Sequence, residues 1–145
     1  LLAIYMNKTD NNIILEADAT LSAKLPQPPN VSCYLGGWII PPQITKAGEV
    51  KINVHPKKGL NSIEYGKFSV LMAHALFIKT FEEAMELFQT TITEKIKNYD
   101  VHLIDLQFLK EYYYPPIFVQ GKHVSEIDQV TNKNDLRTHL YGLKM

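Results

Sequence analysis

Apolar and polar side chains alternate most regularly between residues 15 and 23. Every second residue there is leucine or alanine, and the residues between them are acidic or carry a hydroxyl group. Because successive side chains of a strand point to opposite faces, this period of two predicts a strand with one buried and one solvated face. The apolar segment 1–5 is expected to be a second strand that pairs with it as a β-hairpin across the polar turn 8–12.

Five more strands are expected, several of them bounded by proline-rich or glycine-containing turns. The first covers 33–40, where Gly36 and Gly37 indicate a bulge or a close approach of two backbones. The next covers 50–54 and ends in the turn 56–59, where Gly59 would supply a positive φ. The third, 62–77, has an almost continuously apolar second half, which fits a buried strand but equally a helix over 71–76. The segments 101–109 and 117–120 complete the set.

The strongest helical signal covers residues 81–99. Thr80 and Glu83 have the spacing of a capping box, in which a hydroxyl and a carboxylate satisfy free backbone N–H groups at a helix start. Apolar residues fall on one stripe at a spacing of about 3.6 residues. The stripe consists of Phe81, Met85, Phe88, Ile92, Ile96 and Tyr99. A second, short helix is expected over 135–141, with Asn134 as its N-cap.

This order of elements predicts an α+β fold. We expect a mostly antiparallel sheet or a flattened β-sandwich, with one long amphipathic helix at about 81–99 packed on one face. With 145 residues and 46% hydrophobic composition, the chain has the size of a single domain over 1–145, with a polar C-terminal tail at about 121–145. Because it begins with Leu1 rather than Met, it is also compatible with a fragment of a longer chain.

The charge composition narrows the expected partners. Fifteen basic and fifteen acidic side chains give a net charge of zero, and fourteen of the basic residues are lysine. Arginine makes most bidentate contacts to bases and phosphates, so we expect no nucleic-acid partner. The longest apolar run, 68–78, has 11 residues, whereas a membrane helix needs about 20. With no signal peptide visible, we expect a soluble protein of unknown location and no membrane partner.

One function class to consider is a small hydrolase or transferase whose site is assembled by the fold. Its candidate catalytic side chains are Cys33, His74, His102 and Asp105, with Glu16 as a further acid. Each also has an ordinary structural interpretation. Cys33 lies in a strand with no helix start to lower its thiol pKa, and this favours a small buried hydrophobe. His74 lies in the apolar run and is expected to be a core histidine with a hydrogen-bond partner.

The remaining pairs give no local catalytic motif. His102 and Asp105 are three residues apart on an expected strand and should point to opposite faces. Glu16 and Asp18 share the polar face of the 15–23 strand, which fits a solvated surface. The chain contains no P-loop, GxGxxG, GxSxG, HExxH or EF-hand pattern, so no cofactor and no metal is expected. A small-ligand binder is a third class, with a cavity lined by residues such as Met72, Phe88 and Phe108.

We therefore expect a non-catalytic interaction or assembly module that binds a protein partner or itself. The candidate partner-binding residues are Tyr112, Tyr113 and Tyr114, which precede two rigid prolines, together with Trp38. Aromatic residues beside prolines give contact area at a low entropic cost, as interfaces favour. An unpaired strand edge is expected to take part. The layout alone is similar to that of ring-forming tube proteins of phage tails, which implies a structural subunit of a viral or phage particle.

Overall fold

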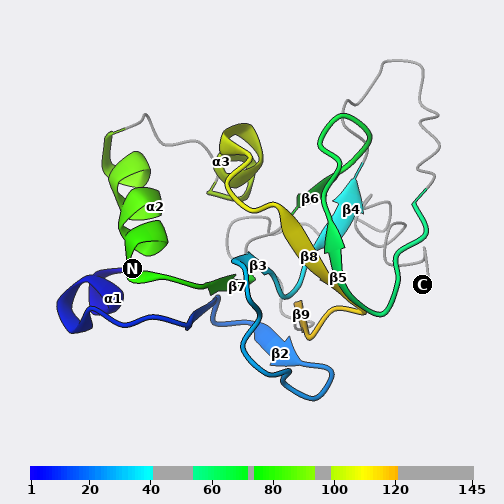
Figure 1. Cartoon of the computed structure of the whole chain (residues 1–145), viewed down its shortest axis with the longest axis horizontal. Helices are drawn as coiled ribbons and strands as arrows, with labels where there is room; N and C mark the ends of the chain where they lie inside the picture. Colours follow the sequence, from blue (N-terminus) through cyan, green and yellow to red (C-terminus); the bar gives the residue numbers. More distant parts are fainter. Residues whose placement is uncertain (41–53, 72–73, 94–98, 121–145) are drawn as a thin grey trace.

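The computed structural model describes residues 1–40, 54–71, 74–93 and 99–120, and Figure 1 shows their arrangement. The helices are α1 (Leu2–Asn7), α2 (Phe81–Thr93) and α3 (Tyr99–Leu106). The strands are β1 (Asn12–Leu15), β2 (Ala19–Leu21), β3 (Cys33–Tyr34), β4 (Trp38–Ile40), β5 (Gly59–Ser62), β6 (Ser69–Leu71), β7 (Ala75–Ile78), β8 (Glu111–Tyr114) and β9 (Phe118–Gln120).

The largest sheet has five strands in the order β1-β7-β3-β8-β5. Strands β3 and β8 run parallel, and the other neighbours in this sheet are antiparallel. Two small antiparallel sheets, β2–β9 and β4–β6, accompany it. The predicted class, mixed α and β with mostly antiparallel pairing, is therefore confirmed for the described residues.

Both faces of the five-stranded sheet are buried, as the alternation along β7 shows. Leu76 and Ile78 point to the face covered by the helices, while Ala75 and Phe77 point to the other face. The helix-side cluster includes Ile4, Tyr34, Phe68, Val70, Ala84, Leu87, Leu103, Leu109 and Tyr112. The opposite cluster is Cys33, Leu35, Ala75, Phe77, Ile117 and Phe118, so β9 and the chain before it cover that face.

Helix α2 begins at the predicted residue, but its cap comes from two parts of the chain. The Thr80 hydroxyl accepts a bond from the Glu83 amide at 3.1 Å, as a capping box requires. The Asp10 carboxylate accepts a second one from the Phe81 amide at 2.8 Å. Glu83 does not complete the box in the usual way, because its carboxylate accepts a hydrogen bond from the Ser32 hydroxyl. The start of α2 is thereby tied to the segments that lead into β1 and β3.

Two predicted strands are helices in the structure. Residues 2–7 form α1 instead of a hairpin strand, because this places Ile4 in the core beside α2. Most of the expected 101–109 strand belongs to α3, which buries the adjacent residues His102 and Leu103. In both segments a short apolar run fits either structure, and packing against the core decides the outcome. Segments 50–53 and 121–145, the latter containing the expected 135–141 helix, lie outside the described residues.

Three longer elements are divided. The expected 15–23 strand is split by a turn into the end of β1 and β2, and the two pieces join different sheets. The 33–40 strand divides into β3 and β4 next to Gly36, and the 62–77 run contains β6 and β7 rather than the helix that was its alternative. The single long helix over 81–99 is not confirmed. Helix α2 has 13 residues, residues 94–98 are outside the described part, and α3 begins at Tyr99.

Candidate functional site

Cys33, the first candidate nucleophile, is a buried core residue. Its side chain has no exposed surface and belongs to the cluster on the face opposite the helices. Burial, with a smaller contribution from Glu111, raises the pKa of its thiol to about 12. Only the thiolate is a good nucleophile, so this cysteine is unreactive at neutral pH. The prediction of a small buried hydrophobe is confirmed.

His74 is also buried and holds two chain segments together. Its Nε2 lies 3.2 Å from the carbonyl oxygen of Phe118, and because a carbonyl only accepts, the imidazole carries a proton on Nε2. Burial lowers the pKa of His74, although the Phe118 bond and the charge of Asp18 act in the opposite direction. The ring is therefore neutral at pH 7. It lies against Gly36, where an added Cβ would come within 2.4 Å of Nε2.

His102 and Asp105 require a correction of the sequence interpretation. They lie on α3, and a spacing of three residues puts them on the same side of a helix, not on opposite faces of a strand. Cys33 and Tyr34 point to opposite faces of the sheet, and Tyr34 belongs to the cluster that contains Leu103 of α3. The Cys33 thiol and α3 are therefore on different sides of the sheet. The fold does not bring the candidate nucleophile to these two residues.

The acidic pair Glu16 and Asp18 does not lie on one strand as expected. It lies at the turn between β1 and β2, where the Ala19 amide bonds to the Glu16 carbonyl at 3.0 Å. Burial, Asp18 and then Asp100 raise the pKa of Glu16. The Asp18 carboxylate accepts a bond from the Gln120 amide group at 2.9 Å. Within the described ranges, no group of three or more histidine, cysteine, aspartate or glutamate side chains is arranged to hold a metal ion.

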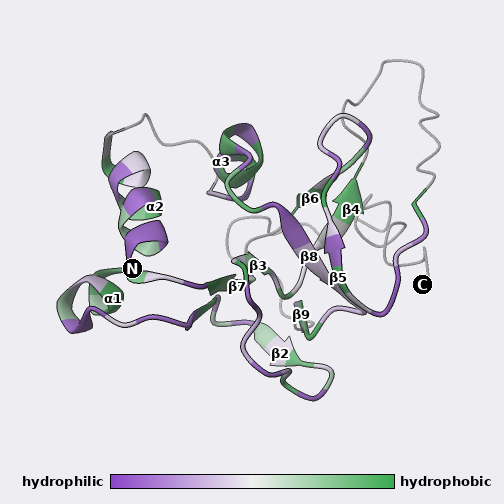
Figure 2. Ribbon diagram, viewed as in Figure 1, coloured by the Kyte–Doolittle hydropathy of each residue, from purple (hydrophilic) through white to green (hydrophobic). Residues whose placement is uncertain are grey.

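The tyrosine segment forms β8, which is next to the edge strand β5. Tyr112 is only 5% exposed, and its ring packs edge-to-face on Phe68 with the centroids 5.8 Å apart. Tyr113 and Tyr114 are half-buried and point to opposite faces of the sheet. In Figure 2 the ribbon of β8 runs from purple to pale, so hydropathy does not mark this strand as apolar, yet its Tyr112 is part of the core. Trp38 belongs to β4, and its side chain is outside the described part of the structure.

One open pocket lies beside this strand. It encloses about 270 Å³, and its lining combines the rings of Phe68 and Tyr112 with polar groups of the β5 region. Among the polar groups, Asn61 already holds the preceding turn through bonds to Lys57 and Gly59. None of the candidate catalytic residues lines this pocket. Of the residues expected around a ligand cavity, Phe88 stacks on Tyr5 instead, and Met72 is outside the described residues.

Among the described residues, the three most exposed large apolar side chains, Met6, Ile92 and Leu2, lie on α1 and α2, on a surface that the sequence interpretation missed. We name it the helical surface and define it as Leu2, Tyr5, Met6 and Ile92, which are 63%, 54%, 72% and 65% exposed. Leu2 and Met6 are one turn apart on α1, and Tyr5 stacks on Phe88 with ring centroids 6.3 Å apart. Ile92 is one turn beyond Phe88 on α2. Figure 1 shows the two helices side by side at one end of the molecule.

The sequence carried a partial signal for this surface. Ile92 was expected on the buried stripe of the helix, because its spacing from Phe88 fits that stripe. In the structure the residues that α2 buries fully are Ala84 and Leu87, which do not belong to that stripe. The stripe residues Phe81, Met85 and Phe88 are half-buried, and Ile92 is exposed. Residues 1–5 were expected to be a hairpin strand, so the outward face of a helix could not be foreseen there.

Comparisons of the chain with models of protein families, with curated protein sequences and with solved structures find no match. In the described part of the chain, each helix is too short or too polar to cross a membrane.

Proposed function

We propose that this chain is a non-catalytic assembly module that binds other protein subunits, copies of itself included. The observation that carries the proposal is the helical surface. Single exposed apolar residues are ordinary, but four large ones on two adjoining helices are typical of a protein contact. A six-residue helix such as α1 is too short to be stable alone, so it depends on its contacts.

The candidate reactive groups support a structural role. Cys33 is a neutral buried thiol, and the Nε2 of His74 is engaged by a backbone carbonyl. Both groups serve the packing of the sheet, which removes the two strongest candidates for a nucleophile and a base from solvent. A partner contact through Tyr113 or Tyr114 stays a prediction, as does a place in a viral or phage particle.

Sedimentation velocity between about 1 and 200 μM tests the proposal. We expect a sedimenting mass above the 16.6 kDa of one chain, and we expect Met6→Ser/Ile92→Ser to lower it. The control is Leu21→Ser/Leu25→Ser, which changes two side chains of similar exposure, 55% and 47%, outside the helical surface. To detect a partner that is not a second copy of this chain, a photo-crosslinking amino acid is placed at Met6, or at Leu21 as the control, in the cells that make the protein. A single-chain mass at all concentrations, together with no crosslinked protein at Met6, would contradict the proposal.

A further inference from the structure

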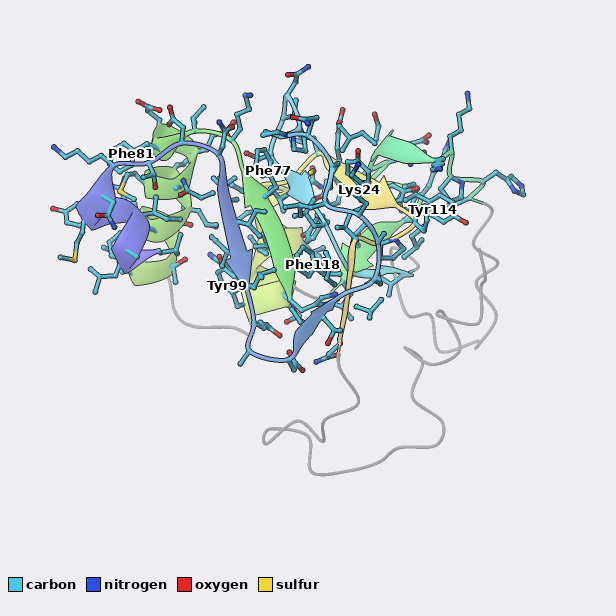
Figure 3. The ribbon with its side chains drawn as sticks, turned by 90° about the horizontal axis from the view of Figure 1, so that it is seen from below. Lys24, Phe77, Phe81, Tyr99, Tyr114 and Phe118 are labelled. Carbon is cyan, nitrogen blue, oxygen red and sulfur yellow. The ribbon has the colours of Figure 1, made fainter. Side chains whose placement is uncertain are left out.

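Strand β1 ends the five-stranded sheet, and its outer edge offers a second surface. Strand β7 pairs with one side of β1, and among the described residues no strand pairs with the other. An edge of this kind leaves backbone N–H and C=O groups that another extended strand can pair with. In Figure 3, which views the molecule from below, β1 lies in the foreground beside β7.

The side chains of β1 give this edge little protection. Natural edge strands are commonly guarded by lysine, proline or a bulge, but the four residues of β1 are Asn-Ile-Ile-Leu. Ile13 and Leu15 are 39% and 46% exposed. They lie opposite Phe77 and Ala75 of β7, so both belong to the face away from the helices. The nearby Asp10 carboxylate is occupied at the start of α2.

We propose that β1 pairs antiparallel with β1 of a second copy of this chain, which joins the two sheets across a two-fold axis. The inference rests on the proposed assembly function and names one partner and one contact for it. A two-fold axis perpendicular to the sheet puts equivalent faces of the two sheets on the same side. A residue of one β1 can therefore lie opposite only those residues of the other β1 whose side chains point to the same face. Two registers then pair most of the strand, centred on Ile13 or on Ile14.

Charge and apolar contact favour the register centred on Ile14. Asp10 and Glu16 lie just outside β1, and centring on Ile13 would bring Asp10 toward Glu16 of the second copy, where two like charges are unfavourable. Centring on Ile14 places Glu16 opposite the neutral Asn12. It also places Ile13 of each copy opposite Leu15 of the other, so the two exposed apolar residues cover each other. The edge is thus complementary to itself, which favours a second copy over an unrelated strand.

Disulfide trapping tests both the contact and its register. Cys33 is the only native cysteine, and because its thiol is buried with a high pKa, an introduced cysteine is the sole reactive thiol. Ile13→Cys and Leu15→Cys chains, distinguished by tags of different length, are mixed and oxidised with glutathione disulfide. Directly opposite Cβ atoms are about 4.5–5.5 Å apart and diagonal ones are farther, so the mixed 13–15 product should form at least tenfold faster than either product of two identical chains.

Leu60→Cys is the matched control, since Leu60 is 38% exposed and lies on β5, the other edge of the same sheet. In parallel, Ile13→Lys should weaken self-association at least tenfold, and Leu60→Lys should not. Unchanged urea midpoints would show that both lysine variants fold. The proposal is overturned if the 13–15 disulfide forms no faster than the Leu60→Cys disulfide and if Ile13→Lys leaves the sedimenting mass unchanged.

The outcomes separate this proposal from the assembly function. A dimer that survives Ile13→Lys but dissociates with Met6→Ser/Ile92→Ser places the contact on the helical surface, so the function stands and the β1 contact is wrong. If the protein sediments as a single chain and a photo-crosslinking amino acid at position 13 captures a different protein, the assembly function stands. The proposal that a second copy occupies the β1 edge is then wrong. A single-chain species without crosslinks at Met6 or Ile13 contradicts both.

Discussion

Gly36 lies where three segments of the chain meet closely. It follows β3, and a Cβ atom added there would lie 2.4 Å from Nε2 of His74 and 2.5 Å from the carbonyl oxygen of Phe118. Ordinary Cβ contacts begin near 3.4 Å, so both neighbours would have to move by roughly an ångström. The Phe118 oxygen is backbone, and the preceding residue Leu35 is itself bonded to the amides of Ile117 and Phe118. The site therefore has little freedom to adjust.

Gly36→Ala is expected to destabilise the fold by about 2–6 kcal/mol. Overpacking a rigid core costs about 1–3 kcal/mol. The movement of the neighbouring groups also separates the His74 ring from the Phe118 carbonyl, and a buried polar group that loses its hydrogen bond costs about 1–3 kcal/mol more. With a urea m-value of about 2 kcal/mol per M, the denaturation midpoint followed by far-UV circular dichroism should fall by about 1–3 M.

Two other glycines are matched controls for this prediction. Gly66 has no atom within 4 Å of an added Cβ, so Gly66→Ala should change stability by no more than about 0.5 kcal/mol. Gly59 has equally open space but a φ of +107°, so Gly59→Ala should cost about 1–3 kcal/mol through backbone strain alone. In a double-mutant cycle with His74→Ala, the cost of Gly36→Ala should fall by at least about 0.5 kcal/mol. A Gly36→Ala midpoint equal to that of Gly66→Ala would refute the reasoning.

Three further predictions concern titration and capping. Because burial lowers the pKa of His74 in the folded state, the unfolded chain gains a proton first below pH 6.5. The contribution of neutral His74 to the free energy of unfolding is therefore fully present above that pH and is lost toward lower pH, by at most about 1.4 kcal/mol per pH unit. Urea titrations at pH 7.5 and 5.5 should show a smaller loss of stability for His74→Gln than for the unchanged protein. Burial raises the pKa of Tyr65 and of Tyr99 to about 12, so both side chains ionise at lower pH in the unfolded chain than in the folded protein. The free energy of unfolding should therefore fall between pH 10 and 12, and less steeply in Tyr99→Phe. At pH 11 the tyrosinate absorbance should be lower in the folded than in the urea-unfolded protein. Asp10→Ala should cost about 1 kcal/mol in urea unfolding by removing the carboxylate cap of α2, whereas Asp10→Asn should retain most of that stability.

The sequence predicts the parts of the fold that depend on local chemistry. The start of α2 is marked by Thr80 and Glu83, and the positive φ at Gly59 is marked by the turn that precedes it. The close approach at Gly36 was also indicated by the glycine pair. The first two features depend on residues that lie near one another along the chain, so a single sequence contains the necessary information. At Gly36 the sequence indicates a close approach but not its partners, because His74 and Phe118 are distant along the chain.

The sequence does not predict features that depend on distant segments. The apolar segment 1–5 becomes helical because Ile4 fits against α2, about 80 residues away, and no local pattern shows this. Of the alternating segment 15–23, only Leu15 and residues 19–21 are strand, because a turn separates β1, which pairs with β7, from β2, which pairs with β9. Burial on both faces likewise follows from topology: the sequence leaves open whether Tyr112 meets a partner or folds back on the core, and in the structure it is a core residue.

Double-sided burial of the sheet limits where this molecule can meet a partner. Helices cover one face, and β9 with the chain before it covers the other, so the described sheet offers its edges more than its faces. The same burial places Cys33 and His74 in the interior, where Cys33 packs in the core and His74 hydrogen-bonds to the carbonyl oxygen of Phe118. Exposed apolar groups occur on α1, on the last turn of α2 and along β1, and also on β2, on β5, on α3 and in the segment between β2 and β3. A contact built there can add a strand or cover a helix without opening the core, as the proposed assembly role requires.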